Sequence, residues 1–69
     1  MPQKGEGPTL AQCRKQLTRG FKVKLPNGHD GVYLCKLGKN MSWVLDGGMK
    51  GPKAAFPTEA IVRATWGIG

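Results

Sequence analysis

The first apolar pattern along the chain has the period of a helix. Apolar residues recur at i, i+3 and i+7, the spacing of one helix face: Leu10, Cys13 and Leu17. Thr9 and Gln12 have the T-x-x-Q spacing of a capping box, and Gly20 is a typical helix stop. The sequence therefore predicts one short amphipathic helix over residues 9–19.

After Gly20 the apolar pattern changes to a period of two, which is typical of half-buried strands. Five short strands are predicted, over residues 21–25, 32–37, 41–45, 54–56 and 61–65. Clusters of Gly, Pro, Asn and Asp separate the first four and predict tight turns. A single helical turn at residues 57–60 is predicted to lead into the last strand.

The ends of the chain are predicted to lie outside this arrangement. Residues 1–8 hold two Gly and two Pro and no apolar residue after Met1, so they are expected to be mobile. Residues 67–69 are expected to form a short tail. The predicted fold is mainly β: a five-stranded small barrel over residues 20–66, with the helix packed on it.

Two segments resemble parts of SH3-like barrels. Residues 51–62, GPKAAFPTEAIV, are similar to the end of SH3-type domains, where a G-x-F-P element leads through a helical turn into a closing strand. Residues 20–25, GFKVKL, followed by Gly28 and Gly31-Val32, look like the opening of KOW-type modules of ribosomal and transcription-elongation proteins. The resemblance implies an SH3-like barrel over residues 20–65 and names no specific family.

The chain departs from peptide-binding SH3 domains in its acidic residues and tyrosines. Those domains use an acidic cluster and paired tyrosines to bind proline-rich, basic ligands. Here only four acidic residues are present and Tyr33 is the single tyrosine. The difference favours an anionic ligand.

The charge balance indicates the class of partner. Eleven Lys and Arg against four Asp and Glu give 69 residues a formal net charge of +7. Such a surplus favours nucleic acid, an anionic membrane surface or an acidic protein as partner, although net charge also serves solubility alone. A domain of this size is thinly stable, which makes a homo-oligomer compatible with any of these functions.

The basic residues are the predicted nucleic-acid contacts, mainly to phosphates. They are Arg14, Lys15, Arg19, Lys22, Lys24, Lys36, Lys39, Lys50, Lys53 and Arg63. Lys22 and Lys24 share one face of a strand, where they either form a phosphate-binding stripe or protect a strand edge from aggregation. Both interpretations stay open at this point.

The aromatic residues divide into predicted core and candidate contact positions. Phe21, Trp43 and Phe56 lie where an apolar side chain is expected to face the core. The parity of Tyr33 requires either a bulge or an inward side chain, and Tyr33 is included as a possible stacking or interface residue. Trp66 is the best candidate for an exposed aromatic, which would stack a base, anchor the tail or form an interface with a second chain.

Catalysis, metal binding and cofactors are not predicted. Cys13 and Cys35 are too few for a disulfide framework, and with the single His29 they give no zinc-ligand spacing. Both cysteines are expected to be small buried hydrophobes. Candidate acid–base pairs lie in separate turns, and an enzyme with a site shared between chains is the weakest of three hypotheses. No signal peptide or membrane span is predicted, and the expected compartment is the cytoplasm.

The sequence thus favours a small basic module that binds DNA or RNA in an accessory or regulatory role. The alternative is a protein-interaction module, or a small inhibitor from a phage or mobile element, that docks on an acidic or apolar patch of a larger protein. Binding of nucleic acid that weakens with salt would support the first hypothesis. Recovery of one protein partner in a pull-down that nuclease does not affect would support the second.

Overall fold

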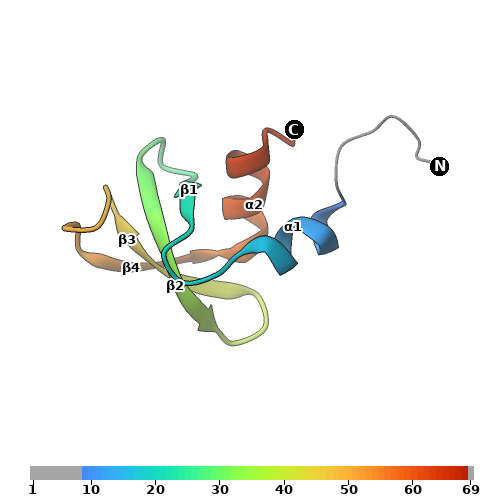
Figure 1. Cartoon of the computed structure of the whole chain (residues 1–69), viewed down its shortest axis with the longest axis horizontal. Coiled ribbons are helices and arrows are strands. Elements are labelled where there is room, and N and C mark those ends of the chain that lie inside the picture. Colours follow the sequence, from blue (N-terminus) through green and yellow to red (C-terminus); the bar gives the residue numbers. More distant parts are fainter. Residues whose placement is uncertain (1–8, 69) are drawn as a thin grey trace.

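The computed structural model describes residues 9–68, which form one four-stranded antiparallel sheet and two helices (Figure 1). The elements in chain order are α1 (Leu10–Gln16), β1 (Lys22–Lys24), β2 (Asp30–Leu37), β3 (Met41–Asp46), β4 (Lys53–Pro57) and α2 (Thr58–Trp66). The strands lie in the sheet in sequence order, β1-β2-β3-β4, so each pairs with the next. The fold is mainly β, as predicted. The mobile segment predicted at residues 1–8 lies outside the described residues.

Helix α1 begins as predicted and ends earlier. The Thr9 side chain accepts a hydrogen bond from the Gln12 amide at 3.2 Å, and the Gln12 side chain accepts one from the Thr9 amide at 3.1 Å. This is the expected capping box. The helix ends at Gln16 and not at residue 19, because Leu17 takes an extended backbone and packs its side chain against the core.

Four of the five predicted strands are confirmed, with ends that differ by one or two residues. The turns between them lie at the predicted Gly-rich positions. In β2 the pairing with β3 shifts between Tyr33 and Cys35, and Tyr33 is 5% exposed. Both alternatives for Tyr33 therefore hold, since the strand bulges and the ring is inside.

The predicted fifth strand at residues 61–65 is wrong, because those residues belong to α2. Thr58, Ile61 and Val62 are buried at i, i+3 and i+4, which is the spacing of one helix face. Gly67 has the left-handed φ of 68° that ends many helices, and the amide of Ile68 donates to the carbonyl of Arg63. With a helix in this position the sheet stays open, and closure into a barrel is not confirmed.

The core lies between α2 and one face of the sheet. It consists of Val23, Leu25, Tyr33, Val44 and Ile61, which are all buried. Around it pack the half-buried Leu17, Phe21 and Phe56, so the core positions predicted for the two phenylalanines are confirmed. Cys13 of α1 is fully buried where α1 packs against α2.

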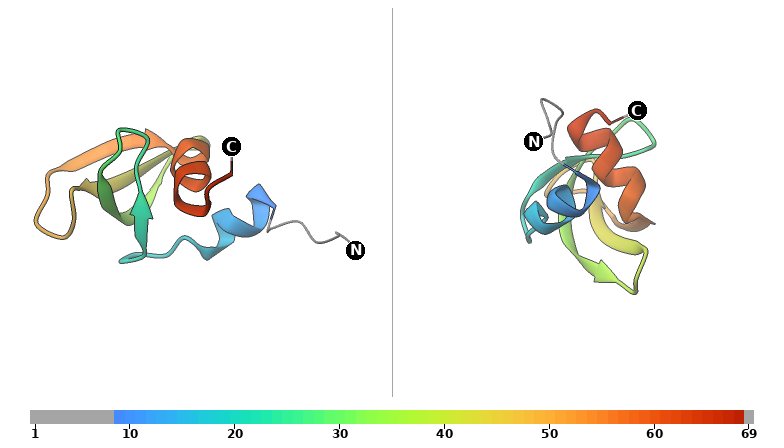
Figure 2. Two further views of the ribbon diagram at one scale, coloured as in Figure 1. Left: turned by 90° about the horizontal axis from the view of Figure 1, so that it is seen from above. Right: turned by 90° about the vertical axis from the view of Figure 1, so that its right-hand side faces the viewer.

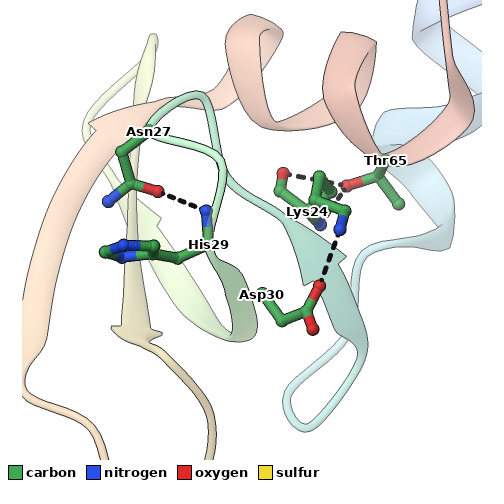
Figure 3. A network of polar contacts seen from close by, with 5 residues as sticks. All are labelled: Lys24, Asn27, His29, Asp30 and Thr65. Atoms are coloured by element: carbon green, nitrogen blue, oxygen red, sulfur yellow. Dashed lines mark hydrogen bonds and ion pairs between the residues drawn. The ribbon is translucent and has the colours of Figure 1, made fainter.

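A helix side chain covers the free edge of β1. The Thr65 hydroxyl accepts a hydrogen bond from the Lys24 amide at 2.9 Å and donates to the Lys24 carbonyl at 3.4 Å (Figure 3). At Lys24, the amide and carbonyl that a fifth strand would have paired are thus bonded to α2. Helix α2 occupies the place where the sequence predicted the closing strand.

The helices and the last hairpin lie at opposite ends of the molecule. Figure 1 and the left view of Figure 2 show α1 at one end and the β3–β4 loop at the other. Among residues 9–68 no helix is long and apolar enough to cross a bilayer.

Candidate nucleic-acid interface

The face of the sheet that points away from α2 carries the candidate site. We call it the outer face. Cross-strand partners lie on the same side of a sheet, so the register identifies its members. One row across all four strands is Lys22, Val32, Leu45 and Lys53; the next rows are Cys35, Trp43 and Ala55, then Leu37, Met41 and Pro57.

The outer face places lysines at its rim and apolar side chains between them. Lys22 and Lys24 extend from edge strand β1, and Lys53 extends from the opposite edge strand β4. Lys22 and Lys53 end the same row, about 14 Å apart at their backbones for three strand spacings. The predicted set of basic residues is thus brought together here in part.

Trp43 belongs to this face and not to the core, contrary to the prediction. Its neighbours in β3, Ser42 and Val44, are both fully buried against α2, while Trp43 is half-buried. The Lys53 ammonium lies 4.8 Å from the centroid of the Trp43 ring, a cation–π distance. The sheet therefore presents an aromatic ring and a cation together, away from the core.

Ser42 explains why the less apolar side of β3 faces inward. Its hydroxyl is fully buried and hydrogen-bonded to the hydroxyl of Thr58 at the start of α2. Because this bond satisfies both polar groups, burial of Ser42 costs little. The pairing spans the sheet and the helix, so the spacing within β3 alone does not predict it.

A groove of about 500 Å³ lies between β1, the β3–β4 loop and Thr65 of α2. Its walls include Lys22, Lys24, Val32, Gly48 and Met49. The Met49 side chain is 72% exposed, the most exposed large apolar residue of the described chain. The loop bends sharply at Gly51, where a Cβ would lie 1.7 Å from the Asp46 carbonyl oxygen.

The remaining predicted basic residues lie elsewhere. Lys15 and Arg19 are exposed on α1 and the turn after it, Lys36 and Lys39 belong to the β2–β3 hairpin, and Lys50 is in the β3–β4 loop. Arg14 donates a hydrogen bond to the Lys39 carbonyl at 3.0 Å, and Arg63 lies 3.7 Å from the Glu59 carboxylate. Arg14 and Arg63 therefore already contact other groups of the protein.

Lys24 also has a partner on the outer face. Its ammonium lies 2.9 Å from the Asp30 carboxylate (Figure 3). The hydrogen bond from Lys24, followed by its charge and that of Lys22, lowers the pKa of Asp30 below its ordinary value of 3.8. Both side chains are more than half exposed, so the pair is weak and Lys24 can exchange Asp30 for another anion.

Two aromatic residues predicted as possible contacts are occupied within the fold. Tyr33 is in the core, which corrects its assignment as a stacking residue. Trp66 is half-buried in α2, and its ring stacks on Phe21 with centroids 5.5 Å apart. Trp66 thus anchors α2 to the segment after α1. Trp43, which is half-buried on the outer face, is therefore the candidate aromatic contact in place of Trp66.

The single histidine, His29, connects the β1–β2 turn to β3. Its amide donates a hydrogen bond to the Asn27 side chain (Figure 3), and its Nδ1 lies 3.0 Å from the Asp46 carboxylate. Asn27 also donates to Asp46, at 3.2 Å. The contacts attach this turn to the end of β3. Within residues 9–68 no cluster of three or more His, Cys, Asp or Glu side chains could hold a metal ion.

The two cysteines differ from each other. Cys13 is fully buried, as predicted, whereas Cys35 is exposed. The β2 bulge explains the second result, because the extra residue after Tyr33 moves Cys35 to the outer face beside Trp43. Period-two alternation without a bulge would have placed Tyr33 and Cys35 on the same side.

Comparison with protein-family models, with curated proteins and with solved structures found no match to this chain.

Proposed function

We propose that this protein is a small nucleic-acid-binding module that contacts phosphates through the lysines of its outer face. The observation that carries the proposal is the surplus of unpaired cations. Among residues 9–68 each of the three carboxylates is engaged, Asp30 with Lys24, Asp46 with His29 and Glu59 with Arg63. Eight of the ten Lys and Arg side chains there have no carboxylate partner.

Lysines on an edge strand can also serve only to prevent aggregation. That explanation is weaker for Lys24 than it was from the sequence. The free edge of β1 is already covered at Lys24 by the Thr65 hydroxyl of α2. Covering an edge with a helix is itself a means of protection, so the Lys24 side chain is available for another role.

The arrangement suits a backbone of phosphates. Lys22 and Lys24 lie along one edge and Lys53 along the other, with an apolar strip between. Such contacts give affinity with little sequence readout, which fits an accessory or regulatory role. The finer fold assignment is part of the proposal: β1–β4 would correspond to four strands of an SH3-like barrel, with α2 in place of the closing strand.

A second candidate function is docking on a protein, as an interaction module or as an inhibitor such as a phage or mobile element would encode. Two exposed large apolar side chains favour it, Met49 at 72% in the β3–β4 loop and Leu37 at 38% at the end of β2, because docking on a partner would remove them from water. Its partner would be acidic, since the apolar strip is bordered by lysines. A pull-down with this protein that recovers one stoichiometric protein partner, and that nuclease does not affect, would favour docking on a protein over nucleic-acid binding.

The test compares two double variants with the same charge change. Lys22→Gln/Lys53→Gln removes two cations from the outer face, and Lys36→Gln/Lys39→Gln removes two from the β2–β3 hairpin. We expect the first to weaken binding of labelled DNA or RNA by about tenfold or more at about 50 mM salt. The second should change affinity by less than about threefold, because neither side chain lies on the outer face.

Fluorescence anisotropy measures the affinities, and far-UV circular dichroism checks that both variants fold. Equal losses in the two variants would show that net charge alone attracts the ligand and would remove the outer face as the site. Wild-type protein that binds neither DNA nor RNA at about 50 mM salt would overturn the proposed function.

A further inference from the structure

Trp43 gives the outer face a feature that phosphate binding does not require. It lies in the central strand β3, half-buried, with Cys35 and Ala55 as its cross-strand partners. Both partners are small, so neither fills the space above the sheet on its side of the ring. A large, half-buried indole between two small neighbours provides a flat apolar surface on this face.

Lysines lie at both edges of the sheet, on the same face as this ring. Lys53 places its ammonium 4.8 Å from the ring centroid, and Lys22 lies across the sheet in the adjacent row. An aromatic platform bordered by cations is the combination by which proteins bind single strands: the ring stacks a base and the cations hold the phosphates. In a duplex the bases are stacked on one another and cannot take this position.

We infer that the ligand is a single strand of nucleic acid, with one base stacked on Trp43 and the adjoining phosphates on Lys53 and Lys22. This inference rests on the proposed function. Stacking of a base on an aromatic ring is stronger than an exposed cation–π contact. A bound base therefore displaces the Lys53 ammonium from the ring, and a phosphate of the same nucleotide gives that ammonium a new partner.

The groove between β1 and the β3–β4 loop extends the path of the strand. It begins at Lys22, Lys24 and Val32, which belong to the outer face, and it continues to Met49. Its lysines suit phosphates, and the exposed thioether of Met49 offers an apolar contact for a second base. A strand that crosses the sheet from β4 to β1 would pass from Trp43 into this groove.

The chain offers a direct reporter of the stacking. Its two tryptophans are Trp43 and Trp66, and Trp66 is stacked on Phe21 away from the outer face. The Trp66→Phe variant keeps an aromatic ring at that position and leaves Trp43 as the sole indole. Its fluorescence should be quenched on titration with an oligothymidylate or oligouridylate of about 12 nucleotides, and should change little with a duplex.

The affinities provide a second, independent readout. We expect the single strands to bind at least about tenfold more tightly than a duplex at equal salt. Trp43→Leu should weaken single-strand binding by about tenfold, the loss of one stacked base, while Trp66→Phe leaves it unchanged. The preference between the DNA and RNA oligomers shows whether a 2′-hydroxyl is recognised.

The outcomes separate the two proposals. Equal binding of single strand and duplex, with no quenching of Trp43, would overturn the single-strand inference and leave a phosphate-binding function in place. Absence of binding to every oligomer would overturn the proposed function as well. If Trp43→Leu does not fold, the fluorescence of the Trp66→Phe protein still decides the question.

Discussion

At the residue scale, one buried pair of hydroxyls orients the central strand. Ser42 and Thr58 are 0% and 3% exposed and are bonded to each other. Their bond keeps Val44 toward the core and Trp43 on the outer face. The position of the candidate site therefore depends on a polar contact between the sheet and α2.

Removal of one hydroxyl should leave the other without this partner in the core. We expect Ser42→Ala or Thr58→Val alone to lower the free energy of unfolding by about 1–3 kcal/mol. The double variant should lose less than the sum of the two, because no polar group is then left unpaired. Urea unfolding of the four proteins measures this cycle. Additive losses would contradict the pairing.

The Lys24–Asp30 pair gives a prediction of pH dependence. The pKa of Asp30 is lower in the folded protein than its ordinary value of 3.8. The stabilisation from Asp30 is therefore fully present above pH 3.8 and is lost as the pH falls through the lowered pKa of the folded state. Both side chains are exposed, so this contribution is small and weakens with salt. The carboxyl titration of Asp30, followed by NMR, should shift upward toward 3.8 in Lys24→Met. The control Lys39→Met should not move it.

Sequence patterns predicted the burial of a side chain where local spacing determines it, and failed where a contact between two distant residues determines it. The burial of Cys13 follows from helical spacing, whereas the inward position of Tyr33 corrects its assignment as a possible contact. The outward position of Trp43 does not, because Met41, Trp43 and Leu45 form the more apolar side of β3. Only the partner hydroxyl in α2, sixteen residues later, makes Ser42 acceptable inside.

At the scale of elements, the main correction is α2 in place of a fifth strand. The β-branched residues of segment 61–65 favoured a strand. Helix signals were nevertheless present: Glu59 in the first turn, Arg63 one turn later and Gly67 after the last helical residue. Tertiary packing chose between them, since Ile61 and Val62 reach the core together only from a helix.

The cap that α2 places on β1 can be tested by one substitution. Thr65→Val keeps the shape of the side chain and removes the hydroxyl that bonds the Lys24 amide and carbonyl. We expect a loss of about 1 kcal/mol in the free energy of unfolding. Hydrogen exchange at the Lys24 amide should become faster. Thr18→Val, at an exposed position between α1 and β1, is the matched control and should change neither.

Unchanged exchange at Lys24 in Thr65→Val would mean that the hydroxyl does not protect the edge of β1. The interpretation of Lys24 would then return to the two equal alternatives drawn from the sequence. This substitution therefore tests the argument for function as well as a structural contact.

At the scale of the whole molecule, the sequence alone determines the net charge, but it did not predict where the basic side chains lie on the surface. A net charge of +7 is counted directly from the residues. The placement of Lys22, Lys24 and Lys53 on the same face as Trp43 depends on strand register, on the bulge in β2 and on α2 covering the opposite face. None of these follows from composition.

The most direct test of the central claim is the salt dependence of nucleic-acid binding. Three phosphate contacts, one for each outer-face lysine, predict a slope of about −2 in log affinity against log salt for a single strand. Affinity should then fall about 20-fold between about 50 and 200 mM salt. Binding that keeps its affinity across that range, or no binding at the lower concentration, would contradict a phosphate-binding outer face.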